Sequence, residues 1–209
     1  MARPVARRGE GRERVLNAAL DLFSVNGVSG TSLHMIAEAL GVTKASVYFQ
    51  FRTKEEIVVA VLTPAFEQMA TLVVAAEAQP TPADRRDTAL TGLVDLVVDH
   101  RRLVAVLRGD AAVGQLLDTH GPWRTLTQRL GHLLLGPDPS HSVRVATSML
   151  GGGLMLSGAD PQLADLTDET LRQELARCAR AVLAAAATSP TPDRAGTRGP
   201  RVHQPEATL

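Results

Sequence analysis

The sequence predicts an all-α fold, with an N-terminal helix-turn-helix domain of three helices joined to a larger all-helical C-terminal domain. Apolar residues recur at helical spacing along most of the chain, and no run of alternating β-branched residues indicates a strand. Near the N-terminus, the segments SLHMIAEAL and KASVYFQF form two short amphipathic stretches separated by the glycine-marked turn GVT. Two short helices around such a turn are typical of a helix-turn-helix.

The N-terminal domain is expected over residues 10–56. Its first helix runs from Glu10 to Asn26, and Gly27 ends it because glycine adopts the left-handed conformation at little cost. Hydroxyl residues precede the later helices, where their oxygens can accept hydrogen bonds from exposed backbone N–H groups. These expected N-caps are Thr31 or Ser32, Thr43 and Thr53, and Glu56 completes a capping box with Thr53. The expected core includes Val42, Val47 and Phe51.

The C-terminal domain is expected over residues 57–187, beginning within a long helix that runs from Lys54 to Ala78. Proline and glycine clusters then divide the chain into helical pieces at about 83–99, 101–118, 122–135, 140–157 and 167–187. Residues 188–209 are rich in proline and poor in large apolar side chains, so we expect a disordered tail. Residues 1–9 form a flexible basic arm in this prediction.

Charge is distributed unevenly, although the chain as a whole is neutral. Residues 1–54 carry eight basic and four acidic side chains, a net charge of +4, which leaves −4 on the remainder. The two lysines, Lys44 and Lys54, both lie at the starts of predicted helices, where a cation can meet a phosphate. This pattern fits a DNA-binding end on a mildly acidic body, and it also fits random scatter.

Several classes of protein are disfavoured. Cys178 is the single cysteine, so no intrachain disulfide is expected, and the basic N-terminus lacks the apolar stretch of a signal peptide. No apolar run is expected to be long enough to span a membrane, which favours a cytoplasmic protein. The histidines show no metal-ligand spacing, and no catalytic motif or phosphate loop is present. We therefore expect no metal, no cofactor and no enzymatic activity.

A specific set of residues spans the four N-terminal helices. It comprises Ala18-Ala19, Phe23, Gly27, Thr31-Ser32, Ile36-Ala37, Gly41-Val42-Thr43-Lys44, Tyr48, Phe51 and Lys54-Glu55-Glu56. With these residues the segment resembles the DNA-binding domain of the TetR family of transcriptional regulators. The resemblance implies a homodimer that binds a palindromic operator in double-stranded DNA, with an all-helical C-terminal domain that binds a small ligand.

The start of the second amphipathic stretch has the small and polar residues that a DNA-reading helix needs. These are Thr43, Lys44, Ala45 and Ser46. Thr53 adds an anion site at a helix start. The resemblance implies base contacts from Lys44, Ala45 and Phe49, phosphate contacts from Ser32, Ser46, Tyr48 and Lys54, and an approach to the groove by His34. Ala45, Phe49 and Gln50 depart from the family pattern, and Phe49 fits either the groove or the core.

The basic residues at the N-terminus, Arg3, Arg7 and Arg8, fit either a minor-groove arm or a solvated tail.

The C-terminal domain has one aromatic residue beyond Phe66, namely Trp123. A pocket between its helices would be lined by aliphatic residues, Met and this tryptophan: Leu93, Val97, Val104, Leu107, Trp123, Leu126, Leu130 and Met149. The same residues fit an ordinary aliphatic core, and the resemblance favours a cavity for a largely apolar molecule. Trp123 either borders that cavity or plugs the end of the bundle.

The last two helices are expected to form the dimer interface. Leu171, Leu175, Cys178 and Val182 recur at spacings of 4, 3 and 4, a stripe that Ala179, Leu183 and Ala186 widen. Gly152 and Gly153 in the preceding helix either allow another helix to approach closely or break that helix in two.

The predicted function is a repressor released from its operator by a small, largely apolar ligand. One alternative is a DNA-binding regulator that has no small ligand. Another is a helical enzyme or carrier with an incidental helix-turn-helix.

Overall fold

The computed structural model describes residues 9–188, without the side chains of residues 107–109 and 111–112. The expected arm and tail, with Arg3, Arg7 and Arg8, lie outside the described residues, apart from Gly9 and Thr188. The described chain forms α1 (Glu10–Asn26), α2 (Leu33–Ala39), α3 (Lys44–Gln50), α4 (Lys54–Glu77), α5 (Pro82–Asp99), α6 (Arg101–Gly109), α7 (Ala111–Thr119), α8 (Gly121–Leu135), α9 (His141–Gly158), the short 3₁₀ helix η1 (Pro161–Leu163) and α10 (Asp168–Thr188).

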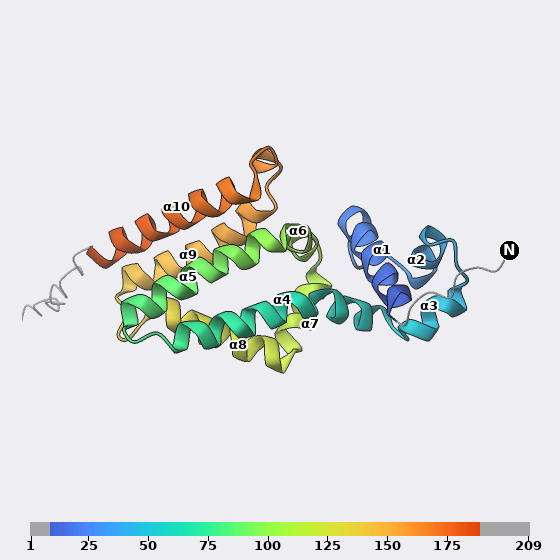
Figure 1. Ribbon diagram of the computed structural model, residues 1–209, viewed down its shortest axis with the longest axis horizontal. Helices are drawn as coiled ribbons and strands as arrows, with labels where there is room; N and C mark the ends of the chain where they lie inside the picture. Colours follow the sequence, from blue (N-terminus) through green and yellow to red (C-terminus); the bar gives the residue numbers. More distant parts are fainter. Residues whose placement is uncertain (1–8, 189–209) are drawn as a thin grey trace, which may run out of the picture.

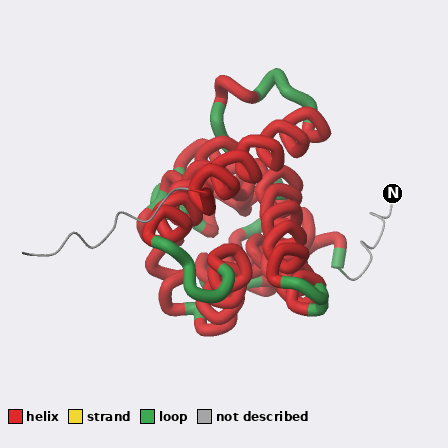
Figure 2. Tube along the Cα trace, turned by 90° about the vertical axis from the view of Figure 1, so that its left-hand side faces the viewer, coloured by secondary structure: helices red, strands yellow, loops and turns green. Residues whose placement is uncertain are grey.

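The molecule is elongated, with α1, α2 and α3 at one end and the remaining helices forming the body (Figure 1). The long helix α4 begins beside the N-terminal helices and extends into the body, where it packs on α5 and α8. Viewed along the long axis, the described chain consists of helices and loops alone (Figure 2). The predicted all-α fold is confirmed, with an N-terminal helix-turn-helix and a helical C-terminal domain.

The helix starts of the N-terminal domain follow the expected caps. The side chains of Ser32, Thr43 and Thr53 each accept a hydrogen bond at 3.2 Å from the backbone N–H three residues later. Thr31 has another role, because its hydroxyl donates to the carbonyl oxygen of Gly27 at 2.8 Å. The expected capping box is not completed, because it requires the Glu56 carboxylate to accept from the backbone N–H of Thr53. Glu56 accepts instead from the backbone N–H of Arg52, one residue earlier.

The N-terminal domain has a compact apolar core in which α1 packs on α2 and α3. Its centre is formed by buried residues of these helices: Val15, Ala19, Phe23, Ile36, Ala37, Val47 and Phe51. Val42 does not belong to this core, contrary to expectation, because 37% of its surface is exposed. It lies in the turn between α2 and α3, where the backbone bond from its N–H to Ala37 O fixes the chain without burying the side chain.

Two sequence-based expectations are wrong for the body. The helix expected over 101–118 is divided into α6 and α7 at Asp110, whose backbone is extended. The second expectation was that no apolar run is long enough to span a membrane. By length and composition alone α4 is long and apolar enough, with 24 residues and a mean hydropathy of 1.8 in its most apolar window. Nine of its residues are buried, which is the pattern of a core helix in a helical bundle.

Candidate DNA interface and ligand cavity

The helix α3 is held to the domain by one buried side chain, Val47, while its other residues are exposed. The exposed set contains Lys44, Ala45, Ser46, Tyr48, Phe49 and Gln50. Thr43 fixes the helix start through Ser46, whose backbone N–H and hydroxyl both lie within hydrogen-bond distance of the Thr43 hydroxyl. The ammonium of Lys44 lies 5.4 Å from the centre of the Tyr48 ring. A cation and a hydroxyl-bearing ring on a free helix face suit a phosphate backbone.

Phe49 lies on the surface and not in the core, because 87% of its area is exposed. The core position is taken by Phe51, which is 2% exposed and carries the guanidinium of Arg12 at 4.6 Å from its ring centre. A large aromatic side chain with that exposure gains nothing for folding. It is available for contact with another molecule.

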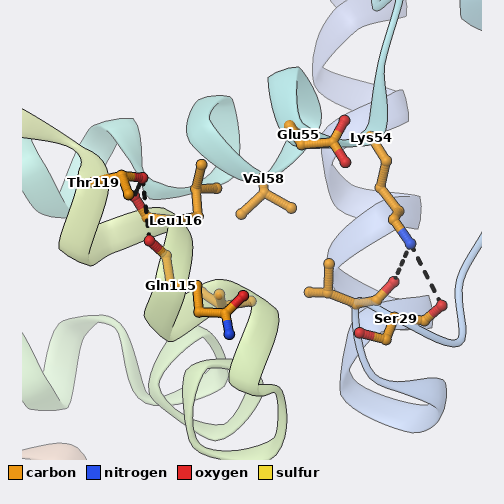
Figure 3. A pocket seen from close by; sticks show the side chains of 9 residues that line it. Ser29, Lys54, Glu55, Val58, Gln115, Leu116 and Thr119 are labelled. Atoms are coloured by element: carbon orange, nitrogen blue, oxygen red, sulfur yellow. Dashed lines mark hydrogen bonds between the residues drawn. The ribbon is translucent and has the colours of Figure 1, made fainter.

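The side chain of Lys54 binds backbone carbonyl oxygens of the loop between α1 and α2. Its ammonium donates to the carbonyl oxygens of Val28 at 2.8 Å, Thr31 at 3.1 Å and Ser29 at 3.4 Å, so its three protons are all engaged within the protein. Two of these bonds are drawn in Figure 3. The phosphate contact that the resemblance implies for Lys54 stays a prediction, and in the structure its side chain binds the protein itself. The lysine thus joins the start of α4 to the loop between α1 and α2.

The start of α4 is also occupied by the protein's own groups. Hydrogen bonds from its own backbone N–H and from Thr53 lower the pKa of Glu55, so a carboxylate already uses this helix N-terminus. The other expected contact residues, Ser32, His34 and Thr53, are exposed. Their role toward DNA stays a prediction.

A cavity of about 320 Å³ lies between the helices of the body. Of the expected lining residues, Leu93, Val97, Val104, Trp123 and Leu130 contribute to its wall. It is completed by Leu62, Ala65, Met69, Leu96, His100, Leu103, Thr127, Gly131, Leu134, Thr147, Gly151 and Met155. Trp123 thus borders the cavity and packs beside Phe66, with ring centres 4.8 Å apart. None of the lining residues has a permanent charge.

Two of the expected lining residues, Leu126 and Met149, do not line the cavity. Leu126 is partly buried against the core, and the side chain of Leu107 lies outside the described residues. Met149 is 67% exposed, so its expected place in the wall is wrong. The helix α9 presents Thr147, Gly151 and Met155 to the cavity, and a residue two positions after Thr147 lies on the opposite side of the helix.

A chain of polar contacts begins at His100 in the cavity wall. His100 Nε2 lies 2.8 Å from Oε1 of Gln68, and Nε2 of Gln68 donates to Oδ2 of Asp99 at 2.8 Å. Arg172 from α10 binds the other oxygen of Asp99. Burial raises the pKa of Asp99, but the hydrogen bonds from Arg172 and Gln68 outweigh it and lower the pKa below its usual value. Burial lowers the pKa of His100, which favours a neutral ring.

The expected dimer residues do not share one face of α10. Leu171 is 1% exposed and packs inside the body, as do the flanking Ala179, Leu183 and Ala186. The expectation that Leu171 faces a partner is wrong, and Leu175 is half-buried beside it. Cys178 and Val182 are exposed.

The neighbouring helix α9 has an exposed apolar stripe. It consists of Val145, Met149, Gly152, Gly153 and Leu156, and a Cβ added at either glycine would meet nothing within 4 Å. The helix continues unbroken through the glycines. Because α9 packs against α10, we use the name dimer face for this stripe together with Cys178 and Val182, and its role in dimerisation stays a prediction.

Sequence reasoning missed Asp110, Ser29 and Gln68. Asp110 is 8% exposed and bonds to Ser29, which precedes it by 81 residues. No spacing or motif in the sequence connects them. Across the described part of the chain, no three His, Cys, Asp or Glu side chains form a group that could hold a metal ion.

Comparison with known proteins agrees with this geometry. Residues 15–61 match the family model of the bacterial regulatory proteins of the tetR family. The fold resembles the ketosteroid transcriptional regulator KstR2 of Mycobacterium tuberculosis, with a TM-score of 0.65 and 17% identity over 88% of this chain and 98% of that one. Residues 15–61 are thus similar to the DNA-binding domain of the tetR family, and the chain as a whole has the fold of a solved regulator.

The TetR-family likeness in sequence is confined to the N-terminal region. The chain is 44% identical over 63 residues to the regulator SrpR of Pseudomonas putida, which is 30% of each protein, and 48% identical over 48 residues to AcrR of Shigella flexneri, which is 23% of this chain and 22% of AcrR. The matches thus span less than a third of these TetR-family relatives. The structural likeness, at 17% identity, extends the shared fold to the body but shows the fold alone.

Proposed function

We propose that this chain is a DNA-binding transcriptional repressor that acts as a cytoplasmic homodimer and releases its operator when a small, largely apolar molecule binds the body. The observation that carries the proposal is the free face of α3, with Lys44, Tyr48 and Phe49 exposed on a helix anchored by Val47. A helix that shows this face to solvent can enter a major groove.

The known proteins it resembles support a repressor. The relative IcaR of Staphylococcus epidermidis is named a negative transcriptional regulator. The structural neighbour NalD of Pseudomonas aeruginosa, at 24% identity and a TM-score of 0.58, is described as the secondary repressor of a multidrug efflux pump. The cavity supports ligand control, because a volume of about 320 Å³ lined mostly by apolar side chains is within the range of small-molecule sites.

A homodimer is supported by the dimer face. A single short helix reads few bases, and two-fold symmetric dimers double the contact along a palindromic site. The exposed Val145, Met149 and Leu156 are apolar side chains whose burial against a second copy would be favourable.

The test is selection of bound DNA from a random pool by the full-length protein, followed by a search for molecules that release it. We expect an enriched sequence with two inverted half-sites about one helical turn apart. A pool that shows no enrichment over several rounds would overturn the proposed DNA function. Binding that persists against a broad set of apolar small molecules would favour the regulator without a ligand.

A further inference from the structure

The cavity excludes charged ligands by its composition. Among its wall residues none is Asp, Glu, Lys or Arg. The carboxylate of Asp99, which follows His100 and Gln68 in the chain of polar contacts, is bound by Arg172. A carboxylate or ammonium transferred into this space would lose its hydration without gaining a counter-charge, which costs several kcal/mol or more.

The polar groups of the wall differ in whether they are already used. Thr127 in α8 donates its hydroxyl to the carbonyl oxygens of Trp123 at 3.1 Å and Arg124 at 3.0 Å. This bonding to the preceding turn is usual for a helical threonine, and Thr63, Thr71 and Thr125 do the same.

Thr147 in α9 is different. Its hydroxyl oxygen is buried and has no hydrogen-bond partner among the described residues. A buried hydroxyl without a partner costs about 1–3 kcal/mol, which a ligand oxygen can recover. Thr147 is a residue of the cavity wall, and its hydroxyl is a donor without a partner in the described chain.

His100 offers an unused acceptor. The ionised Asp99 carboxylate can only accept hydrogen bonds, so the side-chain NH₂ of Gln68 must face it. The 2.8 Å bond from Gln68 Nε2 to Asp99 Oδ2 agrees with this. This leaves the Gln68 carbonyl oxygen facing His100, and Nε2 of His100 must then carry the proton. In a neutral ring the other nitrogen, Nδ1, is an acceptor.

Nδ1 of His100 also does not cap the start of α6, which is a common role for a polar side chain at that position. His120 shows the contrast, because its Nδ1 accepts from the backbone N–H of Trp123 at 3.3 Å and caps α8. Two residues of the wall, His100 and Thr147, thus carry an acceptor and a donor for which the described chain shows no partner.

We propose that the cavity binds an uncharged, largely hydrocarbon alcohol, which donates its hydroxyl proton to His100 and accepts a hydrogen bond from Thr147. This inference rests on the proposed ligand-responsive function and specifies its ligand class. The two glycines of the wall, Gly131 and Gly151, leave room for the hydrocarbon part, since a Cβ at either would meet nothing within 4 Å.

The test uses four probes of similar length, added to the full-length protein without DNA: 1-decanol, methyl nonyl ether, decanoate and decylammonium. Trp123 is the single tryptophan and borders the cavity, so its fluorescence reports binding. We expect saturable binding of decanol, binding of the ether weaker by about three- to tenfold because it cannot donate, and binding of either ion weaker by at least tenfold. Equal binding of an ion, or no binding of any probe, overturns the inference.

Two matched variants test the residues. Thr147→Val keeps the shape of the side chain and should weaken decanol binding about three- to tenfold, whereas Thr127→Val should leave it unchanged. In a His100→Phe protein with wild-type helical content, decanol and the ether should bind alike. Unchanged decanol affinity in Thr147→Val overturns the assigned donor. Operator binding by the wild-type protein is measured separately, so its loss would count against the proposed function and not against the ligand class.

Discussion

The carboxylate of Asp110 accepts two hydrogen bonds from Ser29, one from the backbone N–H at 2.5 Å and one from the hydroxyl at 2.9 Å. Ser29 lies in the loop that leads into α2, and Asp110 lies between α6 and α7. Because Leu103 and Val104 of α6 line the cavity, this contact connects a cavity wall to the N-terminal domain. Lys54 binds the carbonyl oxygens of the same loop from the start of α4.

Replacing Asp110 by alanine should both destabilise the protein and weaken communication between the two domains. We expect a loss of about 1–3 kcal/mol in the free energy of unfolding, because a buried carboxylate bonded to two donors is removed. We also expect the ligand-dependent change in operator affinity to fall at least threefold. Urea unfolding and operator titration with and without ligand measure these effects. Asp118→Ala, at an exposed carboxylate of α7, is the control, and an equal effect of both variants would contradict a special role for Asp110.

The two lysines should behave differently. Lys44→Ala should reduce operator affinity and lower the slope of log affinity against log salt by about one, because an exposed cation that meets a phosphate is lost. Lys54→Ala should leave that slope unchanged and lower the stability, because three carbonyl oxygens lose their donor. Salt-dependent operator titration and urea unfolding distinguish the two. A reduced salt slope for Lys54→Ala would support the phosphate contact that the resemblance implies.

The two phenylalanines at the end of α3 provide a second contrast. Phe49→Ala should weaken operator binding by tenfold or more with little change in stability, since its side chain is 87% exposed. Phe51→Ala should cost about 3–5 kcal/mol of stability, as expected for a buried aromatic side chain. Thermal unfolding and competition for the selected operator separate the outcomes. Full operator affinity in Phe49→Ala would remove this residue from the interface.

Charge on the dimer face should separate the subunits. Met149→Glu should shift the protein toward monomer, because a carboxylate buried against a second copy loses its hydration. Val74→Glu is the matched control, since Val74 is an exposed apolar residue of α4 outside the dimer face. Sedimentation equilibrium over a range of concentrations gives the association constant. The assigned face would be wrong if Met149→Glu assembled as the wild type does.

Local features of the N-terminal domain were predictable because they depend on neighbours along the chain. The caps at Thr43 and Thr53 need a hydroxyl and a backbone N–H three residues later. Both requirements can be checked directly in the sequence. The end of α1 at Gly27 is similar, since that residue adopts a positive φ of 72°. Five residues of the cavity wall were among those expected, although the same residues fit an ordinary aliphatic core and only the family resemblance favoured a cavity.

The remaining assignments depend on pairs of residues far apart in the chain. Periodicity shows that α10 has an apolar stripe, but the packing of α5 and α9 decided that Leu171 faces inward and Val182 outward. A lysine at a helix start suits either a phosphate or a carbonyl, and only the folded loop at residues 28–31 decided the partner of Lys54.

The sequence by itself determined the helices, their caps and the kinship of the first domain, because each depends on short-range hydrogen bonding and side-chain type. The tertiary structure alone decided which polar groups are used and which stay available. Asp110 has Ser29 as its partner, whereas the Thr147 hydroxyl lacks one in the described chain, and the difference arises from where the packed helices place each group.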